Sequence, residues 1–152
     1  MNTYLLHPLA RFLVALIFIM SGVGKIFAFT QTAAMMQSVG FPAPGLFLVG
    51  AILLEIVGGV LLLAGYKARW ASLALVVFLV PATLIFHAAN LADPAQTQMQ
   101  MIQVLKNLAI LGALLKFVAD GAGAYALDNV LVAHNGRAGT GYSARAEPES
   151  AL

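Results

Sequence analysis

The sequence predicts an all-α fold, a bundle of four transmembrane helices, on two observations. Of the 152 residues, 61% are hydrophobic and only 9% are charged, whereas soluble domains carry about 25% charged residues. The chain also contains four long apolar stretches, over about residues 9–29, 46–66, 68–91 and 101–119. A helix of about 20 residues spans the ~30 Å hydrocarbon core of a bilayer. We therefore expect one integral membrane domain, residues 1–133, with the lipid bilayer as its main partner.

The first apolar stretch, Leu9–Phe29, is interpreted as an uncleaved membrane anchor. A signal peptide would have a clean apolar core, but Ser21–Lys25 interrupts this one, and further hydrophobic stretches follow it. The next segment, Thr30–Gly40, is mildly amphipathic and ends in a glycine, a common helix C-cap. We expect it to form a short helix at the membrane interface.

The second stretch, Leu46–Tyr66, carries a single charge, Glu55, near its centre. An ionised carboxylate at that depth costs at least ~2.5 kcal/mol. It is retained only where a cation, a proton or a water-filled cavity compensates the cost. Glu55 is therefore either half of a structural ion pair that locks helices together or part of a functional site.

The remaining stretches are less uniform. Ala68–Leu91 contains Pro81 near its centre, which membrane helices tolerate when neighbouring groups satisfy the freed carbonyl. The fourth stretch, Met101–Ala119, is the most polar, with Gln103, Lys106, Asn107 and Lys116. The semi-apolar segment Ala124–Ala133 is expected along the membrane surface. The tail His134–Leu152 is rich in small and charged residues and is expected to be disordered.

The basic residues indicate the orientation. With four spans, both termini lie on one side of the membrane. Six basic residues fall on that side: Arg11, Lys67, Arg69, Lys116, Arg137 and Arg145. The opposite loops, Thr30–Gly45 and Ala92–Gln100, contain no lysine or arginine. The positive-inside rule therefore predicts that both termini are cytoplasmic.

A group of polar residues falls in the outer half of the predicted bundle. Successive helices alternate in direction, so the end of span one, the start of two, the end of three and the start of four meet there. The candidate ligand-binding residues are Lys25, Glu55, His87, Asn90, Lys106 and Asn107. Spacings such as Ser21–Lys25 and Gln103–Asn107 are i, i+4 and place one polar stripe on each helix.

Simpler interpretations stay open for the same residues. The two lysines could extend to the headgroups, and the amides could hold helices together at ~0.6 kcal/mol each. The sequence also leaves open whether Glu55 pairs with Lys25 or with Lys106.

Several classes of function are disfavoured. The chain has no cysteine, so disulfides, thiolate metal sites and cysteine nucleophiles are excluded. His7 and His134 lie at the opposite face from His87, so we expect no metal or haem site and no intrinsic cofactor. The eight basic residues are scattered rather than clustered, so nucleic acid is not an expected partner.

An ordered series of motifs resembles the DoxX family of bacterial membrane proteins. The first motifs are Arg11-Phe-Leu, Phe18, Ser21-Gly-Val-Gly-Lys25, Gly40-Phe-Pro-Ala-Pro44, Leu54-Glu55, Gly58-Gly59, Leu63 and Gly65. His87, Lys106-Asn-Leu-Ala-Ile-Leu-Gly112, Gly121-Ala-Gly-Ala-Tyr125 and Leu127-Asp128 continue the match. The resemblance implies a four-helix inner-membrane protein. It also implies an association with quinone-linked oxidoreduction in some members, although no residue here marks thiosulfate as a substrate.

Three functional hypotheses follow. The first is a quinone-associated or small-molecule-binding subunit of a membrane redox system, with a bound quinone and a membrane or periplasmic redox partner. In it, the cations polarise a carbonyl or hold an anion, and Glu55 exchanges a proton. The second is a small transporter or proton-coupled permease that uses the polar cavity expected among these residues in the outer half of the bundle. The third is a non-catalytic assembly or stress-tolerance protein whose ion pair is structural. Homo-oligomers fit all three hypotheses.

Overall fold

The computed structural model describes residues 3–88 and 97–133, and every regular element in these ranges is helical. A short 3₁₀ turn, η1 (Thr3–Leu5), leads into five α-helices: α1 (Leu6–Phe27), α2 (Phe29–Ser38), α3 (Pro44–Ala64), α4 (Ala68–Phe86) and α5 (Thr97–Asp120). Residues 127–133 are also helical. Four of the helices, α1, α3, α4 and α5, are long and apolar enough to cross a membrane. The predicted all-α fold with four spans is therefore confirmed.

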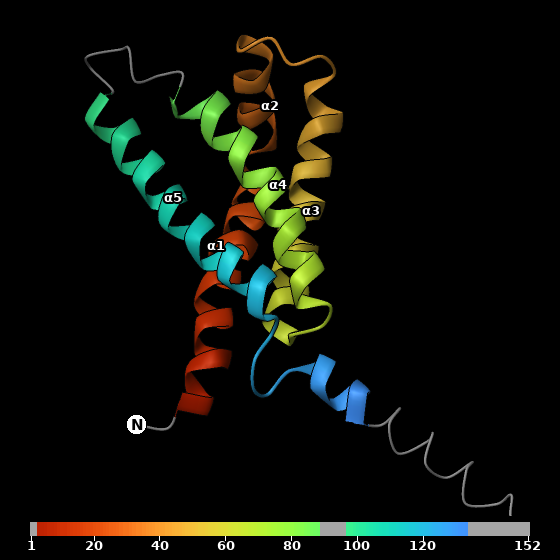
Figure 1. Cartoon of the computed structure of the whole chain (residues 1–152). Coiled ribbons are helices and arrows are strands. Elements are labelled where there is room, and N and C mark those ends of the chain that lie inside the picture. Colours follow the sequence, from red (N-terminus) through yellow and green to blue (C-terminus); the bar gives the residue numbers. More distant parts are fainter. Residues whose placement is uncertain (1–2, 89–96, 134–152) are drawn as a thin grey trace, which may run out of the picture.

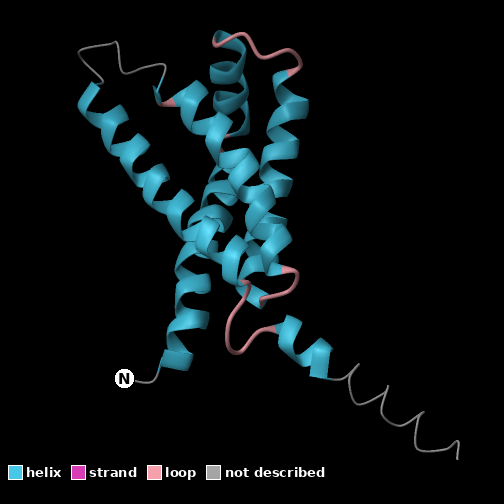
Figure 2. Cartoon of the chain, viewed as in Figure 1, coloured by secondary structure: helices cyan, strands magenta, loops and turns pink. Residues whose placement is uncertain are grey.

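The spanning helices alternate in direction; α2 and a loop join α1 to α3, and a short turn joins α3 to α4 (Figure 2). The start of α1 and the end of α5 lie at one end of the bundle, called here the terminal end, and α2 lies at the other, the distal end (Figure 1). α1 packs mainly against α3, and α4 packs against both α3 and α5. α5 makes few contacts with α1, and Figure 1 shows it diverging from α1 toward the distal end.

The element bounds differ slightly from those expected. The first span begins at Leu6, three residues before the expected Leu9. α2 takes the place of the interfacial helix expected over Thr30–Gly40. The third span ends at Phe86 instead of Leu91. The expectations for Asn90 and for His134–Leu152 concern residues outside the described ranges.

Two glycines allow α1 and α3 to approach closely. A Cβ atom added at Gly22 would lie 2.7 Å from Cγ1 of Ile56, and one added at Gly59 would lie 2.8 Å from Cγ1 of Ile19 and 3.2 Å from the carbonyl oxygen of Ala15. Small residues at such crossings let backbones come together and gain dispersion contacts, which replace the hydrophobic effect as a driving force inside a bilayer. The α1–α3 pair is thus the tightest contact in the bundle.

We expect Gly59→Val to destabilise the protein, because its side chain would be forced against the α1 backbone at Ala15 as well as against Ile19. Overpacking of this kind costs about 1–3 kcal/mol. Gly50→Val is the matched control, since a Cβ at Gly50 of the same helix meets no atom within 4 Å. Unfolding in mixed micelles should separate the two variants. Equal stability would show that α1 and α3 tolerate a wider spacing.

Candidate functional site

A buried charge near the middle of the membrane-spanning region, Glu55, is neutralised by Lys25. The lysine Nζ lies 2.9 Å from Oε1 and 2.8 Å from Oε2 of Glu55, so one ammonium contacts both carboxylate oxygens. The Ser21 hydroxyl donates to Oε1 at 3.0 Å, and Nζ donates to the Ser21 oxygen at 2.6 Å. This triad joins α1 to α3. The question of whether Glu55 pairs with Lys25 or Lys106 is thereby answered in favour of Lys25.

Local sequence explains this geometry. Ser21 and Lys25 are i, i+4 neighbours on α1, so both side chains face α3 together. Gly22, between them, lets the α3 backbone at Ile52 and the Cβ of Glu55 come within 3.4 Å of the position that its own Cβ would occupy. The short Ser21 side chain and the absent side chain of Gly22 thus leave room for the carboxylate.

The two charges of the pair differ in exposure. The Glu55 side chain is 4% exposed, whereas the Lys25 side chain is 26% exposed. A buried carboxylate without a partner would carry a large desolvation cost, which the ammonium and the hydroxyl offset here. The pair is neutral as a unit, and part of its lysine side chain remains exposed.

The polar residues of α4 and α5 form a second, separate group. Nδ1 of His87 lies 2.9 Å from Oε1 of Gln100. The Asn107 amide donates to the Thr83 hydroxyl at 2.9 Å, and that hydroxyl donates to the Leu79 carbonyl at 2.7 Å. These bonds connect the distal half of α4 to that of α5.

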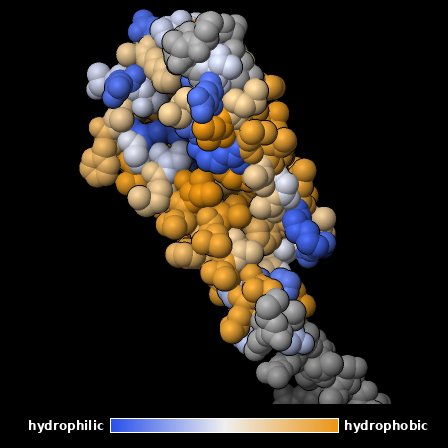
Figure 3. All heavy atoms as spheres, turned by 90° about the vertical axis from the view of Figure 1, so that its left-hand side faces the viewer, coloured by the Kyte–Doolittle hydropathy of each residue, from blue (hydrophilic) through white to orange (hydrophobic). Residues whose placement is uncertain are grey.

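Of the five sequence-predicted site residues that the structure describes, one, Lys106, joins neither group. Lys106 is exposed and donates to Gln103 of its own helix. Asn90 lies outside the described residues. Hydrophilic residues gather in the upper, distal part of the face shown in Figure 3, above a broad hydrophobic band. The structure therefore brings Lys25 and Glu55 together, links His87 and Asn107 to neighbouring polar groups, and directs Lys106 outward.

From the sequence, Arg11 was used only to predict the membrane orientation. In the structure, it holds two segments together at the terminal end of the bundle. Its side chain enters the bundle, and the residue is 2% exposed. Nη1 donates to the Ala122 carbonyl at 2.7 Å, and Nη2 donates to the Tyr125 carbonyl at 2.5 Å. Within the described ranges, Nε has no hydrogen-bond partner. Arg11 thus fastens the segment after α5 to α1. The sequence indicated burial, because Arg11 directly precedes the longest apolar run of the first span, but it did not indicate the partners of Arg11.

The same segment caps the next helix. The Asp128 carboxylate accepts hydrogen bonds from the backbone N–H groups of Lys67, at 2.7 Å, and Ala68, at 3.2 Å. Lys67 has a left-handed backbone, with φ of 47°, at the start of α4. A carboxylate at a helix N-terminus is favourable because it meets the unpaired N–H groups and the positive end of the helix dipole.

Metal binding has no support in the part of the chain that the structure describes. In residues 3–88 and 97–133, no three His, Asp or Glu side chains gather closely enough to hold a metal ion. The two groups contain hydroxyls, amides, an imidazole, one carboxylate and one ammonium. Such groups suit a carbonyl, a hydroxyl or an anion.

The fold and its buried ion pair define a class, a small four-span membrane protein with a charged pair inside the bundle. The DoxX family profile matches residues 6–88, and the chain belongs to this family. It is 36% identical to the inner membrane protein YqjF of Escherichia coli (strain K12) over 122 residues, 80% of this chain and 88% of that protein. It is 31% identical to the inner membrane protein YphA of the same organism over 120 residues, 79% of this chain and 86% of that protein. No solved structure matches the chain.

Proposed function

We propose that this protein binds a small carbonyl-bearing ligand, with quinones as the ligand class, and serves as an accessory subunit of a membrane redox system. The observation that carries the proposal is the unequal exposure of the Lys25–Glu55 pair. A lysine side chain that is partly exposed within a span is unfavourable against lipid tails. It is stabilised where it meets water, a headgroup or a polar ligand. A ligand carbonyl would accept the Lys25 N–H that Ser21 accepts in the structure.

The charge of the site favours a neutral ligand over an anion. Glu55 already balances Lys25, and the second lysine, Lys106, is exposed and bonded within its own helix. An anion would therefore approach a carboxylate without a surplus cation beside it. A quinone is neutral and presents carbonyl oxygens, so its binding leaves the ion pair intact. His87 and Asn107, on the facing helices, are the groups we propose for the rest of the ligand.

In a redox role, the chain would need a partner. It has no cysteine, so a thiol–disulfide step of its own is excluded. Electrons would pass between the bound quinone and a membrane or periplasmic partner protein. Glu55 would then take or release the proton that accompanies quinone reduction.

We expect purified protein to be stabilised by a short-chain quinone in a thermal-shift measurement. A ligand at a hundredfold excess over its Kd adds ~2.7 kcal/mol of stability. The gain should be lost in the double variant Lys25→Met/Glu55→Met, which removes both charges together and leaves no unpaired buried charge.

The double variant Lys116→Met/Asp120→Asn is the matched control. It removes an exposed i, i+4 ion pair near the terminal end of α5 and should keep the full quinone response. A set of small oxyanions and carboxylates completes the screen. The proposal is refuted if no quinone stabilises the wild type, or if both double variants respond as the wild type does.

A second candidate, a non-catalytic assembly protein, is favoured by one observation. Every polar atom of the Ser21–Lys25–Glu55 triad has a partner inside the triad. A triad satisfied in this way can hold α1 to α3 without any ligand. The quinone screen separates the two candidates, because this one predicts no stabilisation by any compound.

We further propose that the protein lies in the bacterial inner membrane with both termini in the cytoplasm. The relatives' names, as inner membrane proteins, and the four spans support the location. The one-sided lysine and arginine distribution supports the orientation.

A fusion of alkaline phosphatase after Leu152 should be inactive, and a fusion of green fluorescent protein there should fluoresce. Phosphatase fused after Gly40, beyond α2, should be active, because that position lies at the opposite end of the bundle. The reverse pattern at both positions would invert the proposed orientation.

A further inference from the structure

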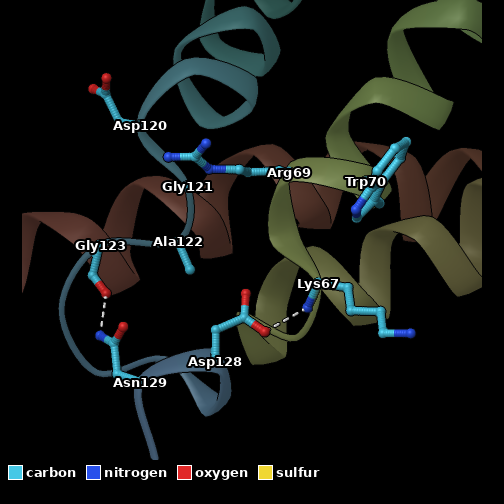
Figure 4. A pocket seen from close by; sticks show the side chains of 9 residues that line it. All are labelled: Lys67, Arg69, Trp70, Asp120, Gly121, Ala122, Gly123, Asp128 and Asn129. Carbon is cyan, nitrogen blue, oxygen red and sulfur yellow. Dashed lines mark hydrogen bonds between the residues drawn. The ribbon is translucent and has the colours of Figure 1, made fainter. Parts of the chain in front are cut away.

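A cavity of about 420 Å³ opens at the terminal end of the bundle, far from the Lys25–Glu55 pair. The start of α4 lines one side of it with Lys67, Arg69 and Trp70, and the segment from Asp120 to Asn129 lines the other (Figure 4). The cavity therefore lies between two segments that are 50 or more residues apart in the sequence. The Asp128 hydrogen bonds join these segments to each other, and the Arg11 hydrogen bonds join the second one to α1.

Arg69 supplies a charge that no described residue neutralises. Its guanidinium makes no hydrogen bond or ion pair within residues 3–88 and 97–133. Its side chain runs toward Gly121 (Figure 4), where a Cβ atom would lie 3.3 Å from Nε. Gly121 thus leaves space for the arginine over the loop. The guanidinium keeps its planar set of N–H donors available, which suits bidentate binding of a phosphate.

Both carboxylates that line the cavity already have partners within the protein. Asp120 pairs with Lys116, and Figure 4 shows its carboxylate directed away from the cavity. Asp128 accepts the N–H groups of Lys67 and Ala68. The Lys67 ammonium lies 5.7 Å from the centre of the Tyr66 ring instead of on a carboxylate.

The surroundings of the cavity are consequently cationic. Arg11 lies directly behind Ala122, and Lys116 lies behind Asp120. Two cations, Lys67 and Arg69, line the cavity together with the carboxylates Asp120 and Asp128, and two further cations, Arg11 and Lys116, contact lining residues from outside it. An anion at Arg69 would meet a positive field.

The depth of the cavity in the membrane indicates which kind of molecule carries the anion. Trp70 is the only tryptophan of the chain and is 72% exposed. It stands three residues into α4, at the end of a span, where an indole ring prefers the headgroup layer. A basic cavity between helix ends at this depth is the arrangement that recognises anionic lipid headgroups. We propose that this cavity binds the phosphate of an anionic phospholipid, with Arg69 as the principal contact.

Lipid binding at this cavity can be measured through the fluorescence of Trp70. Its fluorescence should be quenched by brominated phosphatidylglycerol more strongly than by brominated phosphatidylcholine, in the full-length protein in micelles. A cation near a membrane surface contributes about 1 kcal/mol toward an anionic lipid, which is about a fivefold preference. Arg69→Gln should reduce the preference for phosphatidylglycerol by about that factor, and Arg69→Lys should restore part of it.

Lys106→Gln is the matched control, because it removes an exposed cation from the distal end and should leave the preference unchanged. Unchanged melting and circular dichroism of Arg69→Gln without added lipid would show that the variant is folded. The proposal fails if Arg69→Gln keeps the wild-type preference, or if the two lipids quench equally. Glycerol 3-phosphate that displaces phosphatidylglycerol at equal concentration would overturn the lipid assignment in favour of a soluble phosphate.

Discussion

Glu55→Ala is expected to cost about 3 kcal/mol of unfolding free energy. The substitution leaves the Lys25 ammonium without its carboxylate inside a span, and breaking a buried ion pair by removing one partner costs about 3–5 kcal/mol. We place the value at the lower end because the lysine side chain is 26% exposed and can turn toward the distal surface. Unfolding in mixed micelles, followed by circular dichroism, measures the effect.

Comparison with other variants separates charge from packing. Glu55→Gln should cost less than Glu55→Ala, because the amide oxygen still accepts from Lys25 and Ser21. The double variant Lys25→Met/Glu55→Met should approach wild-type stability, since apolar replacements of a whole buried pair are often neutral or stabilising. Ser21 can then donate to a carbonyl of its own helix. If Glu55→Ala unfolds with the same free energy as the wild type, the ion pair does not stabilise the contact between α1 and α3.

The fold could be predicted because membrane spans have a strong and local signal. Length and hydropathy define each span, and the structure places the four spans close to the predicted ranges. The end of the third span was less predictable. The apolar pattern continues past Phe86, and hydropathy does not register where a helix ends.

The candidate site was predictable only in part. The pairing of Lys25 with Glu55 depends on a close approach of α1 to α3, and the glycines that permit this were visible in the sequence at positions 22 and 59. Lys106 was expected in the same cluster because it lies at the same depth. Depth alone does not fix the direction in which a side chain points, and α5 contacts α1 only sparsely. The rotation of α5 about its axis is set by packing against α4, which composition does not reveal.

The role of Arg11 could not be predicted for a different reason. Its partners are backbone carbonyls at Ala122 and Tyr125, more than 100 residues away, and carbonyls have no sequence signature. A charged residue near a membrane surface is usually counted for orientation alone. The more informative feature was the glycine-rich segment after α5. Gly121, Gly123 and Tyr125 all have positive φ, a shape that turns several carbonyls toward one donor.

Arg11→Met is expected to release the segment 121–133 from the bundle while leaving the four spans folded. The substitution removes the donors to Ala122 and Tyr125, and charge-assisted hydrogen bonds contribute about 1.5–3 kcal/mol each. Part of this loss is offset because a buried guanidinium with an unpaired Nε is no longer desolvated. Amide exchange should therefore accelerate at residues 121–133 but change little in α1 and α3.

The Asp128 contacts should weaken together with the Arg11 contacts. The carboxylate reaches Lys67 and Ala68 only while the segment is held in place, so exchange at these two N–H groups should also accelerate. Arg11→Lys should not restore protection, because a single ammonium cannot reproduce the guanidinium fork between two carbonyls. Arg69→Met is the control, since Arg69 is exposed and makes no hydrogen bond within the described ranges. Wild-type exchange at residues 121–133 in Arg11→Met would show that packing of Ala122 and Ala126 against the core alone holds the segment.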